Sequence, residues 1–310
     1  MAVPYLDFER AVGALEKTAE DLRRRGEAAE AELIAERARR QLADIYGRLS
    51  PWQRTQVARH PARPRFAQWA ALLFTEVTPL AGDRCFGEDP ALFAGFARLR
   101  GRPVAVLAHQ KGHDTETRLA HNFGMARPEG YRKAARLIEL AGRFCLPVIS
   151  LVDTAGAFPG VEAEERGQAE AIAAATAACL DLATPFVAAI VGEGGSGGAV
   201  AVATADRVLM LENAIYSVIS PEGCASILWR SGDAAPQAAD AMKLTAGDLL
   251  RLGVIDRVVY EPPGGAHRAP EAAAGRLAAA LVEELDGLSR LDGEGLRARR
   301  RARYLRLGGH

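Results

Sequence analysis

Residues 185–199 read PFVAAIVGEGGSGGA, an apolar run that passes directly into a cluster of glycines. A short apolar run with β-branched residues is typical of a strand buried on both faces. Glycines at its end allow another molecule to approach the backbone closely. Backbone N–H groups at the start of a helix have no partner within it, so they can hold an anion or an oxygen that becomes one. The stretch therefore predicts a buried strand followed either by a backbone anion site or by a tight turn without a ligand.

Apolar β-rich runs alternate with helical periods through the middle of the chain. Strands separated by helices indicate a mainly parallel sheet with helices packed on it, which is an α/β fold. Ligands of such sheets bind at the carboxyl ends of the strands, and both Asp153 and Gly192 fall at such an end. The expected strands are 102–108, 147–152, 185–191 and 207–211, and the expected helices are 128–144 and 163–182.

Helical patterns flank this region on both sides. Residues 5–50 are charged and carry a narrow apolar stripe that includes Leu33, which predicts packing against another surface. Residues 270–310 are helical again, with Leu277 and Leu281 on one apolar face. We interpret the arginines of this tail as solvent-exposed, namely Arg297, Arg299, Arg300, Arg301, Arg303 and Arg306. The expected division is an N-terminal helical extension at 1–65, a core at 66–265 and a C-terminal helical extension at 266–310.

One motif within the glycine cluster is G-x-G-x-x-G, at Gly192, Gly194 and Gly197, which is typical of dinucleotide-binding turns. A strand precedes it, and Glu212 follows where an acid that binds ribose is expected. However, only residues 198–205 remain for a helix before the next strand, whereas a βαβ crossover takes about a dozen residues or more. The spacing therefore disfavours dinucleotide binding.

A second motif in the same cluster is G-x-S-x-G, which is typical of the nucleophile elbow of serine hydrolases. Its Ser196 would need a histidine as base and a carboxylate that orients the histidine. Downstream of Ser196 the histidines are His267 and His310, and Asp256 would be the acid. Because residues 192–198 contain five glycines, more than an elbow requires, the sequence also disfavours this interpretation.

The composition excludes several classes of function. The 310 residues include 39 Lys+Arg and 39 Asp+Glu, so the net charge gives no general attraction to nucleic acid or to anionic membranes. The four cysteines form no C-x-x-C pair, which predicts no metal site in this chain. We find no signal peptide and no apolar run long enough to span a membrane, which predicts a cytoplasmic protein with reduced thiols.

Two local patterns suggest functions that their surroundings do not support. The segment 241–243, Ala-Met-Lys, resembles a biotin attachment core, but Thr245 and Asp248 just after it have the pattern of a capped helix start. His109 and His113 have the spacing of metal ligands, but no helix crosses the intervening glycine. We interpret 109–118 as a polar loop that could face phosphate groups. Three further basic residues either add to a basic patch with this loop or lie on solvent-exposed helix faces. They are Arg132, Lys133 and Arg166.

Longer motifs occur in a fixed order along the chain. They are GRPV at 101–104, HQKG at 109–112, NFGM at 122–125, PEGYRKA at 128–134, DTAGA at 153–157, AEERGQ at 163–168, GEGGSGGA at 192–199, SVISPEGCASILW at 217–229 and GGAHR at 264–268. In these motifs the chain closely resembles the alpha subunit of the carboxyltransferase of bacterial acetyl-CoA carboxylase. The resemblance covers almost the full length and is strongest from about residue 70 to residue 270.

This resemblance implies a crotonase-like fold of repeated ββα units, with the carboxyltransferase core at 66–265 between the helical extensions. The reaction of that family moves a carboxyl group from carboxybiotin, on a separate biotin carboxyl carrier protein, to acetyl-CoA. The product is malonyl-CoA, and the step commits carbon to fatty acid synthesis. The resemblance further implies a beta subunit in an α2β2 assembly, a zinc ribbon on that beta subunit, and a biotin carboxylase in the larger complex.

For the site, the resemblance implies a backbone oxyanion hole for biotin at the amides of Gly197 and Gly198. Negative charge develops on the biotin ureido oxygen when CO2 leaves, which fits the anion site expected above. A second oxyanion hole, for the thioester enolate, would come from the beta subunit. The biotin nitrogen can take the proton from the acetyl-CoA methyl, so this chain needs no general base. The residues expected to bind substrate or shape the site are Gly194, Gly195, Asp153, Thr154, Gly156, Lys111, Arg132 and Lys133.

Three other functions remain open from the sequence. The chain could serve a carboxyltransferase for another acyl-CoA, because the partner subunit would take part in substrate choice. It could be a crotonase-type hydratase or isomerase, which would need an acid–base carboxylate such as Glu165 or Glu193. It could also be a non-catalytic scaffold in a carboxylase complex.

Overall fold

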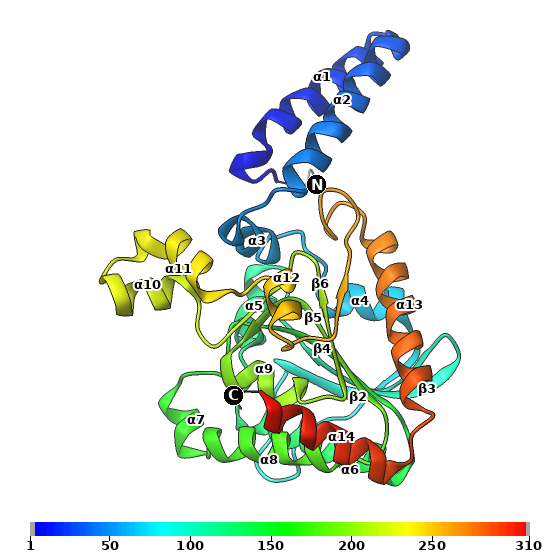
Figure 1. Ribbon diagram of the computed structural model, residues 1–310, viewed down its shortest axis with the longest axis vertical. Helices are drawn as coiled ribbons and strands as arrows, with labels where there is room; N and C mark the ends of the chain where they lie inside the picture. Colours follow the sequence, from blue (N-terminus) through cyan, green and yellow to red (C-terminus); the bar gives the residue numbers. More distant parts are fainter. Residues whose placement is uncertain (1–3, 308–310) are drawn as a thin grey trace.

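A mixed β-sheet of eight strands forms the centre of the molecule (Figure 1). The computed structural model describes residues 4–307. The strand order is β1-β2-β3-β4-β5-β6-β8, and β7 pairs with the end of β5. The strands are β1 (Phe74–Pro79), β2 (Leu92–Leu99), β3 (Arg102–His109), β4 (Val148–Thr154), β5 (Phe186–Gly195), β6 (Arg207–Leu211), β7 (Ile215–Ser217) and β8 (Arg257–Val259).

The four strands expected from the sequence are confirmed as β3, β4, β5 and β6, which lie side by side and parallel. β1, β2 and β3 are antiparallel, and β2, β3 and α6 (Pro128–Arg143) form a ββα unit. Every residue of β4 is buried, as is nearly every residue of β5. Burial on both faces explains why these strands are continuous apolar runs without alternation.

Helices cover the sheet in two groups. In one group α6 packs on β2 and β3, α9 (Ser196–Ala203) packs on β4 and β5, and α8 (Gln168–Asp181) packs against both helices. In the other group α4 (Phe66–Leu73) packs against β1, and α13 (Pro270–Leu288) packs against α4, β5 and β8. The other α-helices are α1 (Arg10–Arg24), α2 (Ala28–Tyr46), α3 (Pro51–Ala58), α5 (Thr115–Ala120), α7 (Val161–Glu165), α10 (Pro221–Trp229), α11 (Ala235–Met242), α12 (Ala246–Arg251) and α14 (Gly293–Arg306), with 3₁₀ turns at Asp7–Glu9, Asn122–Gly124 and Gly232–Ala234.

The single helix expected at 163–182 is wrong, because the chain forms α7 and α8 instead. Gly167 lies between them with a φ of 81°, a left-handed conformation that suits glycine and ends a helix. The helix expected at 128–144 is confirmed as α6.

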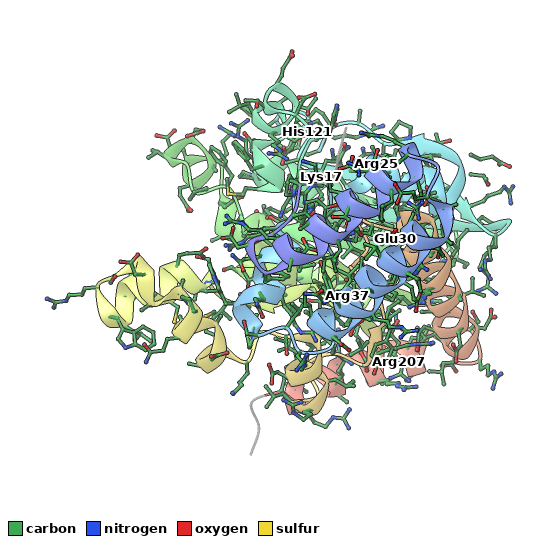
Figure 2. All side chains as sticks on the ribbon, turned by 90° about the horizontal axis from the view of Figure 1, so that it is seen from above. Lys17, Arg25, Glu30, Arg37, His121 and Arg207 are labelled. Atoms are coloured by element: carbon green, nitrogen blue, oxygen red, sulfur yellow. The ribbon has the colours of Figure 1, made fainter. Side chains whose placement is uncertain are left out.

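The N-terminal helices α1 and α2 form a hairpin that projects away from the sheet (Figure 1). Gly26, with a φ of 83°, lies between them, and Val12 and Leu42 are buried in the hairpin's own apolar cluster. Leu33, which we expected in the apolar stripe, is 72% exposed, so that part of the prediction is wrong. Figure 2, viewed onto the hairpin, shows its charged outer side chains, among them Lys17, Arg25, Glu30 and Arg37.

The C-terminal helices are part of the main fold. Leu277, Leu281 and Leu285 on α13 are fully buried in the core, which confirms the predicted apolar face. The proposed division of the chain at residues 65 and 265 stays a prediction. Within residues 4–307, no helix has both the length and the apolar character needed to cross a membrane.

The expectation that the arginines of the tail are solvent-exposed is wrong for Arg300 and Arg303. Arg300 on α14 is completely buried and pairs with Asp206 at 2.6 Å. Its guanidinium also donates to the carbonyls of Cys179, Leu182 and Thr184. Arg303 pairs with Asp256 at 2.5 Å. These bonds fasten α14 to the end of α8, to the loop before β5 and to the residues just before β6 and β8.

We expect Arg300→Met to destabilise the protein strongly, because it leaves Asp206 buried without its partner. Breaking one half of a buried ion pair costs about 3–5 kcal/mol. The exposed Arg297 on the same helix provides a matched control, and Arg297→Met is expected to change the free energy of unfolding by less than about 0.5 kcal/mol. Urea denaturation measures both, and equal losses would contradict the structural role of Arg300.

Candidate active site

The glycine turn, residues 192–198, is the point at which β5 becomes α9. β5 ends at Gly195 and α9 begins at Ser196, so no loop separates them. Ser196 has a φ of 51°, in the left-handed region, and turns the chain sharply at this point. The strand therefore delivers the start of a helix directly to the carboxyl edge of the sheet, as the sequence predicted.

Four of the five glycines in this turn are explained by close contacts within the chain. A β-carbon at Gly192 would collide with the carboxylate of Asp153, and one at Gly195 would collide with the carbonyl of Ala155. A β-carbon at Gly194 would lie 2.7 Å from the Tyr216 ring, and one at Gly198 would lie 2.6 Å from the carbonyl carbon of Gly156. At Gly197 the nearest atom would be 3.7 Å away, on Ile172, which is ordinary contact. The tight-turn interpretation thus accounts for every glycine of the turn except Gly197.

The amides at the start of α9 are the groups that can bind an anion. No side chain caps this helix N-terminus, and the amides of Gly197 and Gly198 lie in the first turn, where a helix offers them no acceptor. The positive end of the helix dipole lies at the same place. The backbone anion site predicted from the sequence is therefore geometrically available.

A buried ion cluster lies against the turn. The Lys111 ammonium is 2.8 Å from Asp153 Oδ1 and 2.7 Å from Glu193 Oε2, and Asp153 Oδ1 also accepts the Glu193 N–H at 3.0 Å. Burial alone would raise the pKa of both carboxyls, but the charge of Lys111 is the largest of the effects that hold both pKa values below their usual range. Both carboxyls are therefore charged at neutral pH.

Two arginines extend this cluster toward the surface. Arg65 pairs with Asp153 Oδ2 at 2.7 Å, and Arg59 pairs with Glu193 Oε1 at 2.7 Å. Arg59 also reaches Glu222 on α10 at 2.5 Å. Neither arginine is recognisable from the sequence, because both lie in a connector that is far from residue 153 along the chain and carries no motif.

The structure brings most of the predicted site residues together. Thr154 donates its hydroxyl to the Gly156 carbonyl at 2.7 Å and accepts the Gly156 N–H at 3.1 Å, which folds the loop after β4 against the glycine turn. Arg132 and Lys133 are engaged elsewhere. Arg132 pairs with Asp83 at 2.7 Å, and the buried Lys133 pairs with Glu88. Among the described residues, neither makes an ion pair or hydrogen bond with the glycine turn, so their role in substrate binding stays a prediction.

The residues of a hydrolase triad do not assemble around Ser196. Asp256 is held by Arg207 and Arg303, and the ring nitrogens of His267 make no hydrogen bond within the described residues. His267 instead stacks on His60, with 4.0 Å between the ring centroids. His310 lies outside the described residues.

The structure also shows the surroundings of the histidine pair and of the Ala-Met-Lys segment. Within residues 4–307 no group of three or more His, Cys, Asp or Glu side chains is arranged to hold a metal ion. His109 is buried, which lowers its pKa to about 4, whereas His113 is exposed. Lys243 ends α11, and Thr245 caps α12 by accepting the Asp248 N–H, as the sequence predicted.

Three cavities in the described part of the chain border the turn and its ion cluster, and the smallest, of 20 Å³, is lined by Glu193, Gly194 and Gly195. One of 460 Å³ has a mainly apolar lining that includes Ser196, Val200, Tyr216, Val218 and Met242. The third, of 490 Å³, has a lining that combines the polar or basic side chains of Lys111, Arg65, Gln68 and His121 with apolar ones such as Phe66. Figure 2 shows His121 at the edge of the molecule, on the side remote from Arg207.

The sheet and its backbone turn place the chain among proteins of crotonase-like fold, and comparison with solved structures confirms that class. The fold is shared with transcarboxylase 12S, at a TM-score of 0.59 and 18% identity, covering 74% of this chain and 42% of that chain. It is also shared with a Pseudomonas malonate decarboxylase hetero-tetramer, at a TM-score of 0.58 and 21% identity, covering 72% of this chain and 91% of that chain.

The chain belongs to the acetyl co-enzyme A carboxylase carboxyltransferase-like family, whose model matches residues 5–308. A relative from Methylobacterium nodulans is 61% identical over 311 residues, and one from Acidiphilium cryptum is 62% identical over 310 residues. Each comparison covers 98% of both chains. Both relatives are acetyl-coenzyme A carboxylase carboxyl transferase subunit alpha, so the resemblance found in the motifs is confirmed.

We expect the glycines of the turn to differ sharply in their tolerance of alanine. Gly195→Ala forces a methyl group against the Ala155 carbonyl and should lower the free energy of unfolding by about 1–3 kcal/mol. Gly197→Ala meets no close neighbour and should change it by less than about 0.5 kcal/mol. Chemical denaturation compares the two variants, and equal losses would show that internal packing does not explain these glycines.

Proposed function

We propose that this chain is the alpha subunit of the carboxyltransferase of acetyl-CoA carboxylase. It would transfer the carboxyl group of carboxybiotin, held on a biotin carboxyl carrier protein, to acetyl-CoA and so form malonyl-CoA. The observation that carries the proposal is the pair of uncapped amides of Gly197 and Gly198, whose neighbours Ser196 and Val200 line an apolar cavity of 460 Å³. The family and the near-full-length relatives support the same reaction.

The residues around the turn fit a biotin group. Bound biotin supplies the carboxyl group and carries negative charge on its ureido oxygen once CO2 has left. The amides of Gly197 and Gly198 are fixed donors that can stabilise this charge without reorganising. Val200, Tyr216 and Val218 offer the apolar surface that the uncharged rings of biotin require.

The same geometry argues against a hydratase or isomerase. Such an enzyme needs a carboxyl that exchanges protons near neutral pH. Glu193 is locked between Lys111 and Arg59, which hold its pKa below the usual range, and Glu165 is exposed on α7. This chain therefore contributes substrate binding and charge stabilisation rather than proton transfer.

The proposal includes partners. A beta subunit in an α2β2 assembly would supply the second oxyanion hole, for the enolate of acetyl-CoA, and would carry the zinc ribbon. The biotin carboxyl carrier protein would present its biotin at the glycine turn, and biotin carboxylase would complete the larger complex. The cytoplasm is the compartment where these partners would meet, and neither nucleic acid nor a membrane takes part. The extensions at 1–65 and 266–310 would flank the 66–265 carboxyltransferase core.

The whole proposal is tested by co-expressing the chain with a candidate beta subunit. We expect the purified pair to carboxylate free biotin with malonyl-CoA as donor, because the two oxyanion holes lie on different chains. Each chain alone should be inactive. Activity of this chain by itself would refute the shared site, and an equal rate with methylmalonyl-CoA would favour the reaction of another acyl-CoA.

The oxyanion hole is tested by exchanging a single backbone atom. Replacing the peptide nitrogen of Gly198 by an ester oxygen removes one donor and adds no bulk, so kcat should fall on the order of 10²–10³-fold. The same exchange at Ala201 in α9 removes an ordinary helix hydrogen bond and is the control. It should cost about 1 kcal/mol of stability and leave kcat unchanged. A normal kcat for the Gly198 ester would refute the assignment.

A further inference from the structure

The regular pairing of β4 and β5 breaks just before the glycine turn. Val152 pairs with Ile190, but Thr154 pairs with Gly194, so two residues along β4 face four along β5. Extra residues in one strand disrupt the ladder of backbone hydrogen bonds and bend that strand. The backbone of β5 at residues 191–193, which sets the position of the glycine turn, is therefore not held by strand pairing alone.

Side chains supply the missing hydrogen bonds of this irregular segment. Asp153 Oδ1 accepts the N–H of Glu193 at 3.0 Å, and Arg63 donates to the carbonyl of Val191 at 2.8 Å. Between these two bonds lies Gly192, where the Asp153 carboxylate fills the space that a β-carbon would need. The backbone of β5 is thus held by charged groups at the point where the ladder stops.

Lys111 links the side chains of Asp153 and Glu193. Its ammonium contacts the carboxylate that holds the backbone N–H of residue 193 and also the side chain of Glu193 itself. The three side chains are only 10%, 7% and 11% exposed for Lys111, Asp153 and Glu193. Lys111 lines the 490 Å³ cavity, but its ammonium is engaged by both carboxylates, which places the three side chains well to fix the backbone between them.

We propose that Lys111 and Glu193 are positioning residues for carboxyl transfer, which act through the backbone of β5 on the amides of Gly197 and Gly198. This inference rests on the proposed function and replaces substrate binding as the role of Lys111. Arg59 and Arg65 keep the cluster neutralised from outside, because each pairs with one of its two carboxylates.

Kinetics of the purified pair of subunits with Lys111→Met and Glu193→Gln test the proposal. Both variants roughly keep side-chain size; Lys111→Met removes the bridge between Asp153 and Glu193, and Glu193→Gln weakens it by removing one of its charges. Because a displacement of about 1 Å can cost 10²-fold in rate, we expect kcat to fall on the order of 10²-fold. The KM values for free biotin and malonyl-CoA should change less than about threefold, because a positioning role gives neither side chain a contact with substrate.

The double variant tests whether the two residues act through one route. If both serve the same backbone, Lys111→Met with Glu193→Gln should be no more than about threefold slower than the slower single variant, far from the product of the two losses. Multiplicative losses would mean that the two side chains act independently, and would overturn the proposal.

Hydrogen exchange in the assembled complex gives a readout that does not depend on activity. We expect faster exchange of the amides at 192–199 in both single variants than in Glu9→Gln. Glu9 is the matched control, because it is a fully buried carboxylate that bonds Tyr46 at 3.0 Å, near the N-terminal hairpin. An unchanged exchange rate at 192–199 would overturn the proposal even if the complex proved inactive.

The outcomes separate this inference from the proposed function. An inactive wild-type complex contradicts the proposed function and leaves the exchange experiment to decide the inference. An active complex in which the variants raise KM at a normal kcat shows that Lys111 binds substrate, and overturns only the inference. A normal kcat and normal KM in both variants overturn it as well.

Discussion

The contact between the carboxylate of Asp153 and the backbone of β5 is the constraint from which the rest of the site follows. The carboxylate accepts the Glu193 N–H and occupies the space beside Gly192. The two strands can approach this closely only because residue 192 has no side chain. The loop after β4 then packs against Gly195 and Gly198, so β5 has no room for a connecting loop and passes at once into α9. Uncapped amides at the edge of the sheet are the consequence.

The electrostatics of the cluster define the kind of chemistry this chain can perform. Burying charges is costly unless each has a partner, and here Lys111, Arg59 and Arg65 alternate with Asp153 and Glu193. The same pairing holds the pKa values of both carboxyls low, so neither exchanges protons near neutral pH. A site built from fixed charges and backbone dipoles stabilises charge that develops on a substrate. It does not itself act as acid or base.

Much of the fold and part of the site could be predicted from the sequence, for physical reasons that differ by residue. The buried strands were recognisable because parallel strands covered on both faces are continuous apolar runs. The break at Gly167 was not, because a glycine within an alanine-rich helical pattern is compatible with either outcome. Arg300 looked like part of a solvated basic face, and only the position of Asp206 in space shows that it is buried. Arg59 and Arg65 were missed for the same reason, since an ion pair between distant segments leaves no local pattern.

The match of the glycine cluster to two different motifs also has a physical explanation. Dinucleotide-binding turns and nucleophile elbows both require a strand that feeds directly into a helix N-terminus, and the glycine turn has that shape, including a positive φ at Ser196. The motifs therefore report the backbone geometry correctly. What they cannot report is the surroundings, and these decide the chemistry. The helix after the turn ends at Ala203, and the ring of His267 stacks on His60 instead of facing the serine. The uncapped amides of the turn are the donors that the proposed carboxyl transfer would use.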